Sequence, residues 1–171
     1  MTIGSLSRSV KVRDAFGLLL LCYISNLCGA AFMAWVFGMT GLLEGPVGEL
    51  LVSSTAAKMN IPFTHALFRG IMCNVLVCLG YWAMSKAQSE AAKLIIIVWV
   101  VAGFVTPGYE HSIANAGIFT MAFMAPSVTP EITLSGIGTN LVPVTLGNLV
   151  GGAFLVGLPY WASGKAKTKT A

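Results

Sequence analysis

The sequence is short of charged residues. Only 9% of its 171 residues are charged, with 6 Asp and Glu against 10 Lys and Arg. An average soluble domain carries about 25% charged residues, so this composition excludes an ordinary water-soluble globule. Apolar residues make up 56% of the chain, which also excludes disorder, because disordered segments have too little apolar surface to bury. The class that remains is a protein embedded in a membrane.

The sequence also lacks the usual patterns of metal and redox sites. Its 4 cysteines lie inside apolar runs without CxxC spacing, which favours small packing residues over zinc ligands or a disulfide framework. Only 2 histidines are present, which leaves little for a haem-binding pair. We therefore predict no metal and no cofactor. The net charge of +4 is interpreted as a record of membrane orientation and not of nucleic-acid binding.

Long apolar runs predict four membrane crossings within one membrane domain, residues 1–171. A helix needs about 20 apolar residues to cross a bilayer core about 30 Å thick. The runs cover residues 15–39, 63–84, 92–125 and 140–162. Asn60 and Pro62 are typical of a helix start before the second run, as are Asn140 and Pro143 at the fourth. The 19 glycines indicate helices that pack closely in lipid.

The third run is too long for one straight crossing and too short for two. Pro107 disfavours helix at the residue before it, and Gly108 permits a sharp bend. Ser112 can then restart a helix. We predict two half-helices, broken near 106–111, that meet close to the middle of the membrane.

The placement of the cations supports four crossings. With the broken run counted once, eight cations fall on one side of the membrane: Arg8, Lys11, Arg13, Lys86, Lys93, Lys165, Lys167 and Lys169. Cytoplasmic loops of membrane proteins are enriched in Lys and Arg. We predict a multi-pass protein of the inner (cytoplasmic) membrane with both termini in the cytoplasm.

A short internal repeat links the first and last runs. Residues 25–32 and 147–154 share the pattern Asn-Leu-x-Gly-x-Ala-Phe, 122 residues apart. This offset spans three crossings and therefore reverses the orientation of the second copy, as in the inverted repeats of many transporters. Two further helices, one of them broken, are then expected upstream of the first run. We interpret the repeated residues Asn26, Gly29, Asn148 and Gly151 as packing residues.

Three segments together resemble the formate/nitrite transporter family. They are residues 69–79 (RGIMCNVLVCL), 108–115 (GYEHSIAN) and 140–148 (NLVPVTLGN). The resemblance covers most of the chain and begins at the family's third helix. It implies an all-α polytopic membrane protein with an aquaporin-like inverted repeat, assembled as a homo-pentamer with a pore in each protomer. The short loop 126–139 resembles the nitrite-channel branch.

The resemblance also implies a function. It predicts a channel or transporter for small monovalent anions of weak acids, nitrite or formate and also hydrosulfide, surrounded by membrane lipid. No covalent chemistry is implied, so the chain is not expected to be an enzyme. Two alternatives stay open: a non-conducting fragment or assembly partner of such a channel, and a membrane redox subunit.

His111, at the predicted break, is the first candidate for the substrate pathway. Ionisable groups at membrane depth are costly and usually functional. An imidazole with an unperturbed pKa of about 6.5 can donate a hydrogen bond or a proton to a passing anion. The alternative is a core histidine bonded to a backbone carbonyl. Asn74 either bonds the unwound backbone, orients His111, or makes an ordinary bond between helices.

The other candidates depend on the family pattern or on the break. The resemblance implies that Phe104 and Val77 line constrictions and that Lys58 lies in an outer vestibule, where it would raise the local anion concentration; alternatively Lys58 is solvated. Glu110 is expected to accept hydrogen bonds from the backbone N–H groups freed at the second half-helix. We expect Asn115, together with Pro107 and Gly108, to be structural.

Overall fold

The structure is a computed structural model that describes residues 1–169, with side chains up to Gly164. Its helices are α1 (Thr2–Leu6), α2 (Val12–Gly38), η1 (Leu42–Glu44), α3 (Pro46–Met59), α4 (Phe63–Lys86), α5 (Glu90–Val105), α6 (Ser112–Met124), α7 (Leu134–Val150), η2 (Gly151–Gly157) and α8 (Leu158–Lys169). No strand occurs among these residues, so the described chain is all-α. The side chains of Lys165, Lys167 and Lys169, three of the cations used to predict orientation, lie outside the described part.

Three helices in the described chain are long and apolar enough to cross a membrane: Val12–Gly38, Phe63–Lys86 and Leu134–Gly164. The third run of the sequence is divided between α5 and α6, of 16 and 13 residues. Neither is long enough to cross alone, because a crossing needs about 20 helical residues. The interval 106–111 lies between them.

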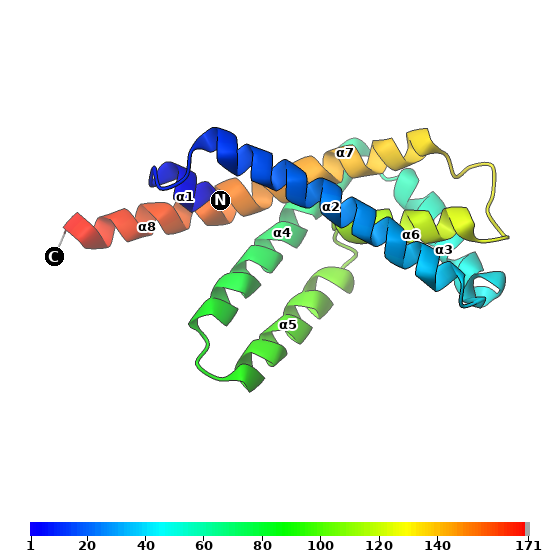
Figure 1. The fold of residues 1–171 in the computed structure, drawn as a ribbon, viewed down its shortest axis with the longest axis horizontal. Helices are drawn as coiled ribbons and strands as arrows, with labels where there is room; N and C mark the ends of the chain where they lie inside the picture. Colours follow the sequence, from blue (N-terminus) through cyan, green and yellow to red (C-terminus); the bar gives the residue numbers. More distant parts are fainter. Residues whose placement is uncertain (170–171) are drawn as a thin grey trace.

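The helices are arranged as two crossing rods with a hairpin at one side (Figure 1). Helix α2 runs in the direction opposite to α7, η2 and α8, and crosses them. Helices α4 and α5 form the hairpin, while α6 continues toward the far end, where it packs against α2 and α3. Helices α1 and α8, with which the described chain begins and ends, both lie on the side of the molecule remote from α3.

Two predicted helix caps differ from the structure. The last long helix begins at Leu134, six residues before Asn140, because the side chain of Thr133 caps it by accepting a hydrogen bond from Gly136 N. Helix α4 begins at Phe63 after Pro62, and no side chain caps it. The Asn60 side chain instead donates to Ala56 O at the end of α3. Asn140 and Asn60 therefore are not helix caps.

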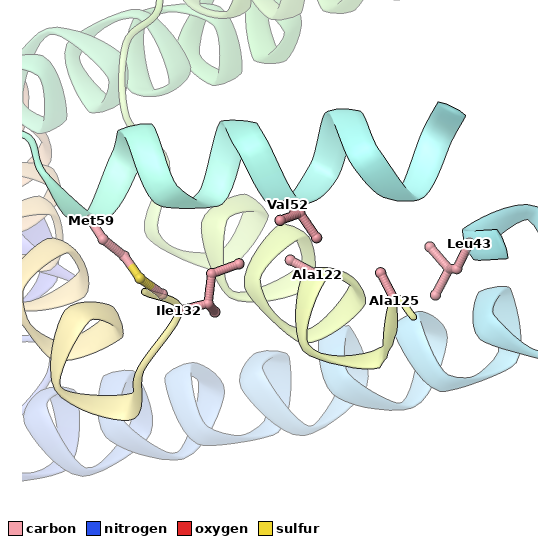
Figure 2. Close-up of a cluster of buried hydrophobic side chains, with 6 residues drawn as sticks. All are labelled: Leu43, Val52, Met59, Ala122, Ala125 and Ile132. Carbon is pink, nitrogen blue, oxygen red and sulfur yellow. The ribbon is translucent and has the colours of Figure 1, made fainter. Parts of the chain in front are cut away.

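Helix α3 was not predicted, and it builds the buried apolar cluster at the far end of the molecule. Figure 2 shows this cluster, formed by Leu43, Val52, Met59, Ala122, Ala125 and Ile132. Its side chains come from η1, α3, α6 and the loop before α7. Elsewhere most large apolar side chains of the long helices are exposed, as expected for surfaces that face lipid or other membrane helices. The cluster therefore holds α3 against α6, where α3 ends beside the helix break.

Candidate functional site

The break between α5 and α6 is built on one left-handed glycine. Gly108 has a φ of 74°, a conformation that costs glycine nothing and other residues much more. Gly108 N and Tyr109 N donate to the carbonyls of Val105 and Phe104, each at 3.0 Å, and so close the end of α5. Helix α6 then restarts at Ser112 with His111 as its N-cap. The chain is thus turned within six residues.

Asn148 of α7 holds the backbone of this break in place. Its side-chain amide donates to Gly70 O at 2.9 Å and to Glu110 O at 3.0 Å, and its Oδ1 accepts from Ser112 N at 3.1 Å. One side chain therefore satisfies backbone groups of α4, the break and α6, groups that water cannot reach inside a bilayer. The interpretation of Asn148 as a packing residue is wrong, because its three bonds are polar and specific.

The Glu110 carboxylate does not cap α6 as expected. Two of the donors freed at the start of that helix are taken by other side chains: Ser112 N donates to Asn148 Oδ1, and Ala114 N donates to His111 Nδ1 at 3.4 Å. Glu110 is 2% exposed, and its Oε1 lies 2.7 Å from Lys58 Nζ. Its carboxylate is therefore free to pair with a cation brought in by α3.

Two asparagines complete the surroundings of this ion pair. Asn115 and Asn140 both donate to Glu110 Oε2, the latter at 3.4 Å. Asn115 Nδ2 also donates to Asn140 Oδ1 at 2.9 Å, and Asn140 Nδ2 donates to Lys58 O at 2.9 Å. The network ties α3, the break, α6 and α7 together. A charge pair in a buried site needs such additional bonds to offset the loss of its hydration.

Lys58 is only partly withdrawn from solvent. Its side chain is 22% exposed, against 2% for Glu110, so its ammonium group lies at the edge of the network and not in its centre. Lys58 is therefore neither a fully solvated loop residue nor free of a counter-charge. The sequence could not show this pair, because Lys58 and Glu110 are 52 residues apart and α3 was not predicted.

An apolar groove between α4 and α5 ends at His111. It has a volume of about 270 Å³ and is lined by Val77, Gly80, Tyr81, Met84, Ile96, Ile97, Val100, Val101, Phe104 and His111. The rings of Phe104 and His111 lie 6.0 Å apart, tilted by 31°. Three of the predicted pathway residues, Val77, Phe104 and His111, thus share one groove, and His111 is the only ionisable side chain among the lining residues besides Tyr81.

Asn74 does not contact His111 by a hydrogen bond in the described structure. Its amide donates to the carbonyl of Asn148, and its Oδ1 lies 3.9 Å from Cys78 Sγ. Asn74 therefore fixes α4 against α7, immediately before the π-helical segment η2. Of the alternatives read from the sequence, the bond between helices is the one observed.

The described residues offer no group of three or more His, Cys, Asp or Glu placed to hold a metal ion. The side chains of Glu110, Asn115, Asn140 and Asn148 are already bonded at the break, as given above. The arrangement provides an apolar groove that ends at the titratable side chain of His111. The neighbouring residue, Glu110, forms the ion pair with Lys58. Such a fold defines a polytopic membrane protein whose polar site lies at a break between two short helices.

Comparison with known proteins identifies the family. The model of the formate/nitrite transporter family matches residues 1–162. The nitrite transporter NirC of Escherichia coli is 38% identical over 162 residues, which cover 94% of this chain and 60% of that protein. The formate channel FocA of the same organism is 35% identical, over 81% of this chain and 55% of its own length. The chain therefore belongs to the formate/nitrite transporter family, and the resemblance drawn from the three motifs is confirmed.

Solved structures agree with the fold. A structure titled an FNT family ion channel matches with a TM-score of 0.89 and 34% identity, over 95% of this chain and 65% of its own. A pentameric formate channel with formate bound matches with a TM-score of 0.74 and 32% identity, over 82% of this chain and 62% of its own. The all-α polytopic fold is thus confirmed. The chain spans about 60% of the length of the nitrite transporters it matches.

Proposed function

We propose that this chain forms one wall of a channel for small monovalent anions of weak acids, with nitrite and formate as the substrates. The observation that carries the proposal is the position of His111 at the end of the α4–α5 groove. Its Nδ1 accepts a hydrogen bond from Ala114 N, so a neutral imidazole carries its proton on Nε2. That nitrogen is then the one able to donate to an anion in the groove.

The surroundings of His111 favour a transient anion over a bound cation. A helix N-terminus carries partial positive charge, and α6 begins directly after His111. The remainder of the groove is almost entirely apolar, so an anion meets no other donor there except the Tyr81 hydroxyl. Protonation of the ring to the imidazolium, which gives up the hydrogen bond from Ala114 N to Nδ1, would make His111 an acid able to lend the anion a proton. The substrate would then pass this section as a neutral acid and leave the imidazole neutral. Lys58, at the partly exposed edge of its ion pair, would attract anions toward the break.

The relatives support the choice of substrate and assembly. Proteins 38% and 35% identical to this chain are named a nitrite transporter and a formate channel. One of the matching solved structures is titled a pentameric formate channel with formate bound. We therefore propose a homo-pentamer that transports and carries out no enzymatic reaction. Hydrosulfide, another small monovalent anion of a weak acid, belongs to the same substrate class.

We place the protein in the inner membrane with both termini in the cytoplasm. The positive-inside pattern of the sequence supports this orientation. Helices α1 and α8, with which the described chain begins and ends, also lie side by side (Figure 1), as an even number of crossings requires.

The α4–α5 groove needs a second wall to enclose an anion. Tyr81 is 73% exposed, and Ile97 and Val101 are 43% and 44% exposed, although all three line the groove. This exposure favours a chain that conducts only together with further helices over a chain that conducts alone. Proteoliposomes holding the 171-residue chain alone distinguish the two: selective nitrite flux supports a self-sufficient channel, and its absence supports an assembly partner.

The role of His111 is tested by the variant His111→Asn. Asparagine keeps a polar side chain that can accept at the helix start but removes the titratable group. The chain is combined with the part of the Escherichia coli nitrite transporter that the match leaves out, and nitrite and formate uptake is measured from pH 5 to 8. We expect the pH dependence near the range of imidazole to disappear in the variant. An unchanged pH profile in an intact assembly would refute the proton-lending role.

A further inference from the structure

Helix α7 does not continue into α8 as a regular α-helix. Between them lies η2, a π-helix of 7 residues. At its end Leu158 N donates to Ala153 O, five residues earlier, whereas an α-helix bonds residues four apart. A π segment of this kind holds one residue more than the α-helix that it interrupts. All residues beyond it are therefore turned about the helix axis by one residue, about 100°.

This extra residue decides which face of the helix meets α4. Gly147 and Gly151 lie against the α4 backbone so closely that a Cβ on either would meet a carbonyl oxygen of that helix. In an uninterrupted α-helix, residues four apart share a face. The same face would then continue with Leu155 and Pro159, and these two residues would be the next to contact α4.

The structure shows the register shifted by one. Val156 is the buried residue, 6% exposed, while Leu155 is 55% exposed. Tyr160, one turn beyond Val156, stacks on Trp82 of α4 with the ring centroids 4.9 Å apart. The face of α8 that packs on α4 is therefore the one that the π segment selects.

The shifted register keeps a cavity open beside the α4–α5 groove. This cavity has a volume of about 430 Å³, and η2 lines it with Val156 and Gly157. Val77 and Tyr81 of α4 line both the cavity and the groove, so the two spaces adjoin. If η2 were an α-helix, each residue beyond it would take the place now held by the residue after it. Leu155 would replace Val156 and Val156 would replace Gly157, and the larger side chains would fill the cavity.

The side chain of Asn74 lies where the regular ladder of hydrogen bonds is lost. Its amide donates to Asn148 O, the carbonyl that in an α-helix accepts from the N–H of residue 152. Gly152 leaves the space for this amide, because a Cβ there would stand 2.6 Å from Asn74 Nδ2. A side chain that inserts into the ladder of a helix is a known cause of such local deformation.

We infer that Asn74 is a positioning residue: it holds η2 in the π form by occupying the carbonyl of Asn148, and so sets the register of α8 on α4. Its consequence for transport rests on the proposed function, because the cavity that this register keeps open adjoins the groove ending at His111. The inference about register itself does not depend on transport.

The register is measured by the exchange of one exposed and one buried position. Leu155→Cys and Val156→Cys are made separately in a chain whose cysteines other than the buried Cys73 are replaced by alanine. The rate of alkylation by N-ethylmaleimide in detergent is measured for each. We expect Leu155→Cys to react much faster, and the ratio of the two rates to fall about tenfold or more when Asn74→Leu is added. Asn60→Leu is the matched control, since it also removes an amide bonded to a backbone carbonyl, in α3, and it should leave the ratio unchanged.

A deletion separates lost register from general loosening. Removal of Ala153 from the Asn74→Leu chain takes out the extra residue, so a regular α-helix again buries Val156 and exposes Leu155. We expect the original ratio of rates to return. If Asn74→Leu does not accumulate in membranes, Gly152→Ala displaces the same amide and should lower the ratio in the same way.

The two claims are tested by separate outcomes. An unchanged ratio in the folded Asn74→Leu chain, or a lowered ratio that the deletion of Ala153 does not restore, would overturn the positioning role. Nitrite flux is then measured in the chain assembled with the remaining part of the Escherichia coli nitrite transporter. It should fall in Asn74→Leu and recover with the deletion. If the ratio of rates follows the expected order while the flux stays constant, the positioning role stands and the proposed path of the anion fails.

Discussion

At the scale of single residues, the stability of the site depends on a charge pair that sequence reasoning did not find. Glu110 is buried, and its carboxylate is held by Lys58, Asn115 and Asn140. The motif around His111 identified Glu110 as a residue of interest, but a motif says nothing about partners 52 and 30 residues away. His111, Val77 and Phe104 were predicted as pathway residues and line one groove, because the family pattern records which positions face inward.

Removal of the Lys58 ammonium should destabilise the protein strongly. Lys58→Met leaves Glu110 charged and buried without its cation, and breaking such a pair costs about 3–5 kcal/mol. The matched control is Lys93→Met. Lys93 pairs with Glu90 at 2.6 Å, but that glutamate is 84% exposed, and surface pairs contribute about 0–1 kcal/mol. Thermal unfolding in detergent should show a large fall in unfolding temperature for Lys58→Met and almost none for Lys93→Met.

A double variant separates two causes of the instability of Lys58→Met: the unpaired carboxylate of Glu110, and the loss of the lysine side chain itself. Lys58→Met with Glu110→Gln has no buried charge left, and a glutamine can still accept from Asn115 and Asn140. Its unfolding temperature should recover most of what Lys58→Met alone loses. Equal unfolding temperatures for the single and double variants would show that the buried carboxylate was never the cause.

At the scale of helices, most long elements could be predicted from apolar runs, and the break could be predicted from Pro107 and Gly108. The interval 106–111 between α5 and α6 lies where those residues place it, because a left-handed glycine after proline ends a helix on local chemistry alone. Helix α3 could not be predicted, because residues 46–59 form no long apolar run and the helix is stabilised by distant contacts from α6. The start of α7 at Leu134 was missed for a similar reason: the polar cap Thr133 lies outside the apolar run.

The contact between α4 and α7 should depend on Gly147. A Cβ there would meet Leu67 O and approach Gly70 Cα at 3.1 Å, so Gly147→Ala must push two backbones apart. Overpacking of this kind costs about 1–3 kcal/mol. Gly138→Ala is the control on the same helix, because a Cβ at Gly138 meets no atom within 4 Å, and alanine favours helix over glycine.

Thermal unfolding of the two variants in the same detergent measures this difference. Gly147→Ala should unfold at a lower temperature than the unmodified chain, and Gly138→Ala at the same or a higher one. If Gly147→Ala were as stable as Gly138→Ala, α4 and α7 would not be in backbone contact.

At the scale of the whole molecule, the charge pattern and the fold make one joint prediction about orientation. Cysteines placed at Ser89 and Ser163 should react with an impermeant thiol reagent from the cytoplasm only, and one at Ser53 from the outside only. All three serines are exposed in the structure. Labelling in inverted and in right-side-out vesicles measures this. Reaction of the Ser163 site from the outside would mean that α5 and α6 do not together make one crossing.

The internal repeat can be found in the sequence, but only the structure shows which of the repeated residues make contacts. The pattern shared by residues 25–32 and 147–154 predicts an inverted architecture, yet it does not say which residues are in use. Asn148 is bonded three times to other segments by its side chain, while its counterpart Asn26 is bonded to none in the described chain. That difference depends on tertiary contacts, which no local pattern records.

We propose the α4–α5 groove ending at His111 as the path of the anion, and chemical blocking of one lining position tests this path. Ile97 lines the groove, whereas Ile95 is on the same helix, is 58% exposed and is not among the lining residues. Each is replaced by cysteine in the chain assembled with the remaining part of the relative, and nitrite flux is measured before and after a bulky thiol reagent. We expect modification of Ile97→Cys to reduce the flux at least tenfold and modification of Ile95→Cys to leave it unchanged. Full flux through an assembly with a modified Ile97→Cys would contradict this path.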